Sequence, residues 1–250
     1  WLQGLGIQLG EEELNEWIAK LREACGPALS ANRTMGALGG IVASRIARTF
    51  RIGGPSFTVS AEETSGLCAL KSGLRALQKN ELDQVIVGSV DLASDLRAAK
   101  GHIEHYGKTT IADGATAFIL KRYKDALRDG DKVYSIIKGI GSATAGGGDL
   151  KAIDPGVQIN SIQNACADAQ CHLDEIDQIV YSTQDEVLTD SPILKNARIN
   201  TFSLGHSGAA SGLMTVASAI TGLYHRLLPT DKASNTQYWL KDRVNGSRKS

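Results

Sequence analysis

Short apolar segments alternate with helical segments along most of the chain, and this alternation constrains the fold more than any other feature of the sequence. Residues 83–90 and 116–121 are almost continuously apolar and have the length of β-strands. Strands of this kind are typical of sheets that are buried on both faces. Helices must then cover those faces, so the pattern predicts an α/β fold with mixed or parallel sheets covered by helices.

The expected elements follow one another closely along the 250 residues. Strands are expected at 56–60, 83–90, 116–121, 132–140, 178–182 and 199–203. Helices are expected at 11–23, 32–48, 62–79, 125–128, 159–171 and 207–224, and the polar tail 230–250 is expected to form a loop. The two halves, 1–150 and 151–250, look like related βα units, and we expect them to form one compact body.

Composition and charge narrow the functional classes. Lys and Arg number 27, as do Asp and Glu, so the net charge is zero. Neutrality argues against an extended nucleic-acid surface, and no apolar run approaches the roughly 18–20 residues that a membrane span needs. Four cysteines are too few for a disulfide scaffold, so a reducing compartment, the cytoplasm, is expected. The chain starts with Trp1 and not Met, so we expect the native N-terminus to lie further upstream.

The glycine-rich run 139–148 (GIGSATAGGG) invites a dinucleotide-binding interpretation, but Thr144 stands where G-x-G-x-x-G needs glycine. A loop that ends a strand is the simpler interpretation. The sequence gives equally little support for a metal site, because no second pair of ligands accompanies Cys166, Cys171 and His172. His102-Ile-Glu-His105 does not match H-E-x-x-H either. We therefore expect no cofactor and no metal.

Two strand-to-helix turns are stronger candidates for a functional site, because backbone N–H groups at a helix start can stabilise developing negative charge. One is 205–209 (GHSGA), a near match to G-x-S-x-G, so it is interpreted either as a nucleophile elbow at Ser207 or as a tight turn. Its His206 is a core histidine, a catalytic donor or neither. The other turn places Glu62 and Glu63 at a helix start, where the helix dipole alone accounts for two carboxylates.

Four motifs in order resemble the β-ketoacyl synthases of the thiolase superfamily, especially those of polyketide and polyunsaturated fatty acid synthases. Residues 44–70 (SRIARTFRIGGPSFTVSAEETSGLCAL) are similar to the family's segment around its nucleophile, usually GPS-x-TVDTACSSSL. Residues 84–91 (QVIVGSVD) match the strand that follows, and 112–139 match the family's ADG…LKRL-x-DAL-x-DGD stretch. Residues 204–213 (LGHSGAASGL) match IGH-x-x-x-AAG.

The resemblance implies a catalytic Cys-His-His set, in which the cysteine takes the acyl group and the histidines help decarboxylate a malonyl unit. In this chain the nucleophile position carries Glu63, and Cys68 lies five residues further on inside the helix. Thr183 takes the place of the first histidine, and the second is retained as His206. The family's lysine shortly before that histidine is replaced by Thr201. The family's opening region and its closing G-F-G-G-T-N-x-H strand are absent from the chain, so the fold is expected to be incomplete at both ends.

The resemblance therefore implies a thiolase-like layered α-β-α-β-α fold and a degenerate member akin to chain-length factors, which lack the cysteine and pair with an active ketosynthase. Its implied partners are an acyl carrier protein and an active ketosynthase, or a second copy of itself in a dimer. The alternatives are residual malonyl-carrier-protein decarboxylation or thioester hydrolysis by His206 and Glu63, an unrelated hydrolase built on Ser207, and an active 3-oxoacyl-carrier-protein synthase in the full protein. The substituted nucleophile predicts that condensation fails, because a carboxylate is a poor acyl acceptor from a thioester.

Overall fold

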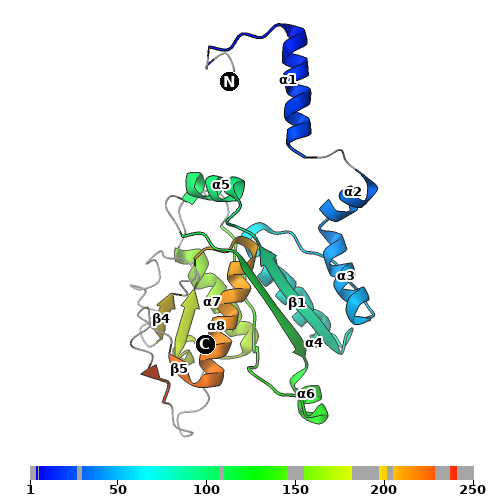
Figure 1. Ribbon diagram of the computed structural model, residues 1–250. Coiled ribbons are helices and arrows are strands. Elements are labelled where there is room, and N and C mark those ends of the chain that lie inside the picture. Colours follow the sequence, from blue (N-terminus) through cyan, green and yellow to red (C-terminus); the bar gives the residue numbers. More distant parts are fainter. Residues whose placement is uncertain are drawn as a thin grey trace. The chain divides into compact units, whose positions relative to one another are not determined.

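A computed structural model of the chain describes residues 4, 6–26, 30–106, 110–145, 155–181, 197–201, 205–228 and 237–240 (Figure 1). The chain divides into two compact units, Trp1–Thr58 and Val59–Ser250. Residues 146–154 are outside the described ranges, so the boundary expected near residue 150 stays a prediction. None of the described helices is both long and apolar enough to cross a membrane.

The described residues of the first unit form the helices α1 (Glu11–Ala24), α2 (Ala31–Ala37) and α3 (Gly40–Phe50). The helix expected at 11–23 is confirmed, but the single helix expected at 32–48 is wrong. Leu38 takes an extended conformation (φ −81°, ψ 110°) and divides it into two, and the glycines on either side of the break disfavour a continuous helix. Ser30, not Asn32, caps the first piece by accepting a hydrogen bond from the Arg33 backbone N–H at 3.3 Å.

The second unit is built on an antiparallel pair of strands, β1 (Gln84–Asp91) and β2 (Gly114–Lys121). Their register runs from Gln84 opposite Lys121 to Asp91 opposite Gly114. Two helices pack on this pair, α4 (Ser65–Gln78) and α8 (Ser211–His225). The core lies between these elements, where Leu70, Val87 and Leu213 are buried. Partly buried apolar side chains surround these three, among them Leu74, Phe118, Leu120, Ile137 and Ile140.

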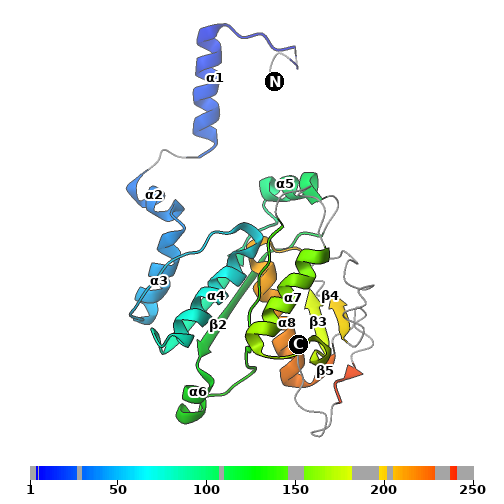
Figure 2. The same cartoon turned by 180° about the vertical axis from the view of Figure 1, so that it is seen from behind.

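The remaining described elements complete a mixed α/β architecture. Strands β3 (Gln178–Tyr181) and β4 (Arg198–Thr201) pair in parallel, and the two-residue strands β5 (Leu227–Leu228) and β6 (Gln237–Tyr238) pair antiparallel. The helices are α5 (Leu96–Tyr106), α6 (Tyr123–Asp129) and α7 (Pro155–Ala169), with a 3₁₀ turn η3 at Leu173–Glu175. Figure 2 shows α4 and α7 side by side over the strands. The α/β class and most expected elements are confirmed; α5 was not expected, and β6 lies in the tail expected to be loop.

Two expected strands are wrong among the described residues, because neither 56–60 nor 132–140 pairs with a neighbouring strand there. A strand needs a hydrogen-bonding partner as well as an apolar pattern. Thr58 instead donates its hydroxyl hydrogen to the Gly39 carbonyl at 2.9 Å. The second segment leads to a close crossing with α7.

Gly139 and Gly141 make this crossing possible. A Cβ added at Gly139 would overlap the Ala165 carbonyl oxygen, and one added at Gly141 would overlap the Ser161 carbonyl oxygen. Asp168 on α7 fixes the same crossing, since its Oδ2 accepts the Ile140 backbone N–H at 2.9 Å. The first glycines of the glycine-rich run therefore allow two backbones to touch, which is a packing role.

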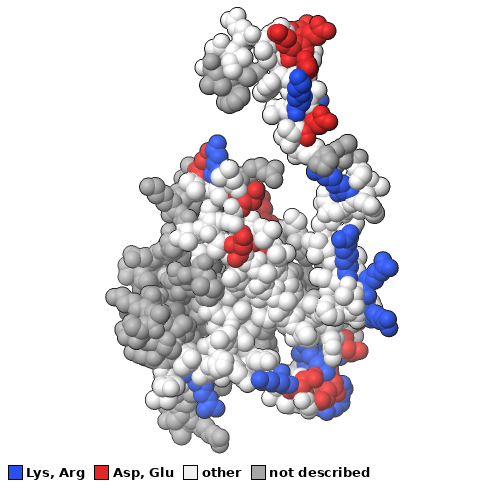
Figure 3. Space-filling model, in the orientation of Figure 1, with Lys and Arg blue, Asp and Glu red and all other residues white. Residues whose placement is uncertain are grey.

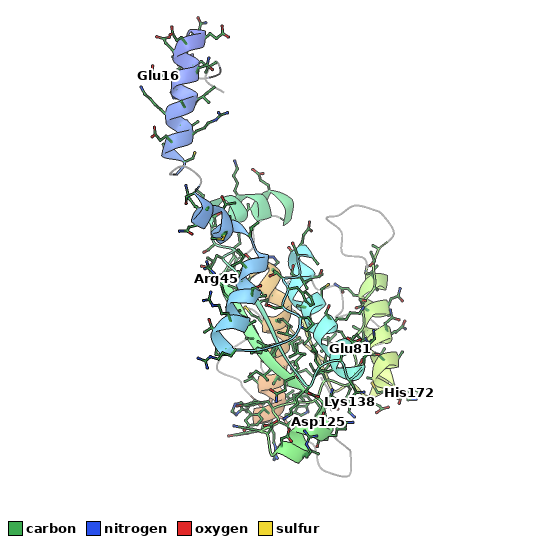
Figure 4. All side chains as sticks on the ribbon, turned by 90° about the vertical axis from the view of Figure 1, so that its right-hand side faces the viewer. Glu16, Arg45, Glu81, Asp125, Lys138 and His172 are labelled. Carbon is green, nitrogen blue, oxygen red and sulfur yellow. The ribbon has the colours of Figure 1, made fainter. Side chains whose placement is uncertain are left out.

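A network of ion pairs closes the end of β2, within the stretch 120–131 that resembles the family's LKRL-x-DAL-x-DGD motif. Arg122 donates through Nη1 to the Leu82 carbonyl at 2.6 Å and through Nε to Asp125 at 2.5 Å. Arg122 holds the pKa of the Asp125 carboxyl below its usual range, against the effect of desolvation. Figure 3 shows positive and negative side chains intermingled over α6, and Figure 4 labels Asp125 on that helix. Arg122 thus ties α6 to the segment between α4 and β1.

We expect Gly141→Ala to destabilise the protein by about 1–3 kcal/mol, because the added methyl group must separate two backbones in contact. The matched control is Gly101→Ala in the exposed middle of α5, where nothing lies within 4 Å of the added Cβ. That change should instead stabilise by about 0.5–1 kcal/mol, because alanine favours helix. Urea denaturation measures both, and an unchanged midpoint for Gly141→Ala would contradict the crossing.

Asp168 should make stability depend on pH in the acid range. The Ile140 N–H and then Arg75 hold the pKa of the Asp168 carboxyl below its usual 3.8. A carboxyl whose pKa is lowered on folding stabilises the protein above the unfolded pKa, and that contribution is lost as pH falls through the folded value. We expect the stability difference between wild type and Asp168→Asn to be full at pH 6 and to shrink below about pH 4. Parallel acid titrations followed by circular dichroism would test this, and a constant difference would contradict it.

Candidate functional site

The candidate site lies where two tight turns meet, each leading into a helix that packs on the β1–β2 pair. The 3₁₀ turn η2 (Glu62–Thr64) leads into α4, and the 3₁₀ turn η6 (Gly208–Ala210) leads into α8. Gly66 at the start of α4 allows the close approach, since a Cβ there would lie 3.0 Å from the Ala209 carbonyl oxygen and 3.0 Å from Leu213. The packing of the two helix starts therefore places the two turns in contact.

The turn that carries Glu63 is closed by its own side chains. The Ala61 backbone N–H donates to Ser65 Oγ at 2.9 Å, and Thr64 Oγ1 donates to the Ala61 carbonyl at 2.7 Å. Glu62 has a φ of +50°, in the left-handed region that non-glycine residues rarely adopt. This bend presents the next residue, Glu63, at the head of the turn, where its side chain is 47% exposed.

His206 is held by backbone hydrogen bonds to a segment far away in sequence. Its N–H donates to the Thr110 carbonyl at 2.7 Å, and its carbonyl accepts the Ala112 N–H at 3.0 Å. Gly205 has a φ of +95°, and a Cβ there would lie 3.0 Å from the Ala112 methyl group. The glycine before the histidine is therefore required by conformation and by space.

The structure brings Glu63 and His206 together. Glu63 Oε1 lies 3.1 Å from His206 Nε2, which is an ion pair when the imidazole is protonated. The imidazole is 19% exposed and the carboxylate 47%, so the pair lies at a partly open surface. Two of the three residues that the resemblance implies for the site thus contact each other directly. The third, Thr183, lies outside the described residues.

Ser207 is not placed as a nucleophile. It is 1% exposed, and its Oγ is buried without a hydrogen-bond partner. Its backbone N–H donates to Ser211 Oγ at 2.8 Å, and a Cβ added at Gly114 would lie 2.7 Å from its Cβ. A hydroxyl enclosed in this way cannot reach a substrate, so the nucleophile-elbow interpretation of 205–209 is not supported by the geometry.

The cysteines and the other candidate ligands do not extend the site. Cys68 is half-buried on α4, with its Sγ 3.8 Å from Thr64 Oγ1. Cys166 is buried on α7, as a small apolar side chain would be. Across the described part of the chain, no three His, Cys, Asp or Glu side chains gather as a metal-ligand set.

The sequence interpretation assigned no role to Asp91, the last residue of β1, which contacts the His206 turn. Its Oδ2 accepts the Ala209 backbone N–H at 2.8 Å. A second carboxylate nearby, Asp113, accepts from the backbone N–H and the hydroxyl of Ser94, and these hydrogen bonds lower its pKa. The only signals for Asp91 in the sequence were its place at the end of an apolar strand and a glycine at position 208.

Comparisons with known proteins agree with this architecture. The model of the β-ketoacyl synthase N-terminal domain matches residues 3–104. The pikromycin polyketide synthase component PikAIII of Streptomyces venezuelae is 26% identical over 259 residues, covering 90% of this chain and 16% of the relative. The hybrid PKS-NRPS synthetase TAS1 of Gloeophyllum trabeum is 26% identical over 221 residues, covering 75% of this chain and 14% of the relative.

Solved structures show the same fold. The ketosynthase from module 6 of the bacillaene synthase from Bacillus subtilis 168 superposes with a TM-score of 0.72 at 20% identity, covering 87% of this chain and 49% of that one. The oxazolomycin ketosynthase domain OzmH KS7 of Streptomyces albus JA3453 gives 0.73 at 18% identity, covering 92% and 49%.

Residues 3–104 therefore match the N-terminal domain of the β-ketoacyl synthases, and the α/β fold of the chain is the thiolase-like fold of the solved ketosynthases. The chain is similar to part of polyketide synthase components and of hybrid PKS-NRPS synthetases. It spans about half the length of the solved ketosynthases and a much smaller part of the multidomain relatives.

Replacing either of two buried serines beside His206 by alanine should change the stability of the protein, and the two changes should have opposite signs. Ser207→Ala removes a buried hydroxyl without a partner, so we expect no loss of stability and a gain of up to about 1–3 kcal/mol. Ser211→Ala removes the acceptor of the Ser207 N–H and should destabilise by about 1–3 kcal/mol. Thermal and urea unfolding of both proteins would test this pair, and a strongly destabilised Ser207→Ala protein would contradict the assignment.

Proposed function

We propose that this chain is a ketosynthase-fold domain of a fatty acid or polyketide synthase that no longer condenses acyl chains and acts as a chain-length-factor-like partner. The observation that carries the proposal is the contact between Glu63 and His206. By the resemblance, Glu63 stands where the family carries its nucleophilic cysteine. The contact pairs that position with the retained histidine of the catalytic set.

Chemistry at position 63 argues against acyl transfer. A carboxylate attacks a thioester poorly, and the mixed anhydride that it would form hydrolyses in water. The tetrahedral adduct formed by that attack would also expel the carboxylate more readily than the thiolate, so the starting thioester would be regenerated. Condensation by way of an acyl-enzyme therefore has no suitable nucleophile at this position.

The contact with Glu63 also occupies the histidine. In the family the two histidines serve the decarboxylation of the malonyl unit, and a hydrogen bond to the forming enolate oxygen is the contribution that His206 could make here. Its Nε2 already lies 3.1 Å from the Glu63 carboxylate, so this donor is engaged before any substrate arrives. Losing one such donor typically lowers a rate by about 10²–10³-fold. Thr183 at the first histidine position would remove a second donor.

The proposal extends to partners and location. We infer that the domain works in the cytoplasm beside an acyl carrier protein, and that it pairs with an active ketosynthase or with a second copy of itself. The support is the resemblance of 44–70 and 112–139 to polyketide and polyunsaturated fatty acid synthases, together with the similarity to polyketide synthase components. A partner of this kind would contribute the shape of an acyl tunnel, and the active subunit would supply the chemistry.

Radiolabelled acyl- and malonyl-carrier protein test the proposal directly. We expect the wild-type protein to gain no covalent acyl label and to release no carbon dioxide or free acid above background. Glu63→Cys restores a thiol at the proposed nucleophile position and should become acylated. Glu62→Cys is the matched control, one residue away in the same turn, and should remain unlabelled.

Other outcomes would replace the proposal. Acylation and chain elongation by the wild type would identify an active synthase. Release of carbon dioxide or free acid without label would identify a residual decarboxylase or thioesterase. A folded Glu63→Cys protein that stays unlabelled would contradict the assignment of position 63.

A further inference from the structure

We propose that Asp91 is a positioning residue: its carboxylate clamps the turn that carries His206 and so holds the imidazole against Glu63. This inference rests on the Glu63–His206 contact that supports the proposed function, and it concerns how that contact is maintained. Asp91 acts on the backbone between His206 and α8.

The clamp is a hydrogen bond between parts of the chain that are 118 residues apart. Asp91 Oδ2 accepts the backbone N–H of Ala209 at 2.8 Å. Ala209 belongs to η6, the turn between His206 and α8. Figure 1 shows the end of β1 beside the start of α8. The carboxylate of a sheet residue thus holds the turn that leads into a helix from another part of the chain.

The turn is shaped to receive this carboxylate. Gly208 has a φ of +47°, and a Cβ added there would overlap Asp91 Oδ2 and lie 2.8 Å from its Cγ. Only a residue without a side chain leaves this space. The cross-strand partner of Asp91 is Gly114, and a Cβ there would in turn overlap Met214 and crowd Ser207. Both strands of the β1–β2 pair are therefore fitted to the His206 turn.

The other hydrogen bonds of the turn do not replace the clamp. His206 bonds through its backbone to Thr110 and Ala112, which fixes the segment before the turn. The Ser207 N–H bonds to Ser211, which lies on α8 and moves with that helix. The bond to Asp91 links the middle of the turn to the sheet.

The charge of Asp91 strengthens this link. Hydrogen bonds to an ionised acceptor are stronger than neutral ones, and a negative charge near the start of the 15-residue helix α8 is stabilising. Removing the carboxylate should loosen the turn while leaving the flanking segments bonded. The expected result is a larger average separation of His206 from Glu63.

Carbethoxylation of His206 by diethyl pyrocarbonate, resolved residue by residue with mass spectrometry, measures the protection of its imidazole. Glu63→Ala should raise the rate at His206 about fivefold, since a typical net hydrogen bond is removed. Asp91→Ala should raise it by a similar factor. Asp91→Asn keeps an acceptor oxygen and the size of the side chain, so it should restore most of the protection. The double variant Asp91→Ala/Glu63→Ala should exceed neither single variant.

The outcomes separate this inference from the proposed function. A raised rate in Glu63→Ala but not in Asp91→Ala overturns the role of Asp91 and leaves the pair intact. An unchanged rate in Glu63→Ala overturns the contact on which both ideas rest. His172 and His225 are exposed internal references, and an equal rise at all three histidines in Asp91→Ala would show general loosening and contradict a positioning role. Asp91→Ser, which is too short to reach Ala209, serves the same test if the alanine protein does not fold.

Discussion

The close approach of two helix starts over the end of β1 is the interaction on which the site depends. Gly66 brings the start of α4 against the Ala209 carbonyl and Leu213, and Gly208 brings the start of α8 against the Asp91 carboxylate. Larger side chains at either position would separate the two turns by the width of a methyl group or more. Glu63 and His206 meet because the two turns pack closely at these glycines, and the 3.1 Å contact is the result.

Local patterns were sufficient to predict the elements whose own sequence determines them. The helix α4 and the strands β1 and β2 follow from apolar patterning, because each buries a face that the sequence marks. The helix α1 also follows from this periodicity, although it contains no buried residue. The segments 56–60 and 132–140 have the same apolar character but pair with no strand among the described residues. Pairing depends on where the rest of the chain lies, which no local pattern contains. The glycines at 139 and 141 showed that something unusual happens there, and only the structure identifies it as the crossing with α7.

Within the site, the sequence motifs identified two of the interacting residues but missed a third. Similarity to the family selected Glu63 and His206, and the structure places them in contact. Asp91 was missed because an acidic residue at a strand end is typical of an ordinary solvated terminus. Its role depends on a bond to Ala209, 118 residues away, and on the missing side chain at Gly208.

The stabilising interactions of the fold are made by residues other than Glu63, so the fold and the chemistry at position 63 can change independently. The core of Leu70, Val87 and Leu213, the Arg122 network at the end of β2 and the Asp168 bonds at the α7 crossing are all made by other residues. A change from thiol to carboxylate at the head of η2 therefore leaves those interactions in place. Hydrophobic burial is the main favourable contribution to the stability of a domain, so the proposed replacement of a nucleophile would leave the fold intact. Retention of shape without the nucleophile is the physical condition that a chain-length-factor-like role requires.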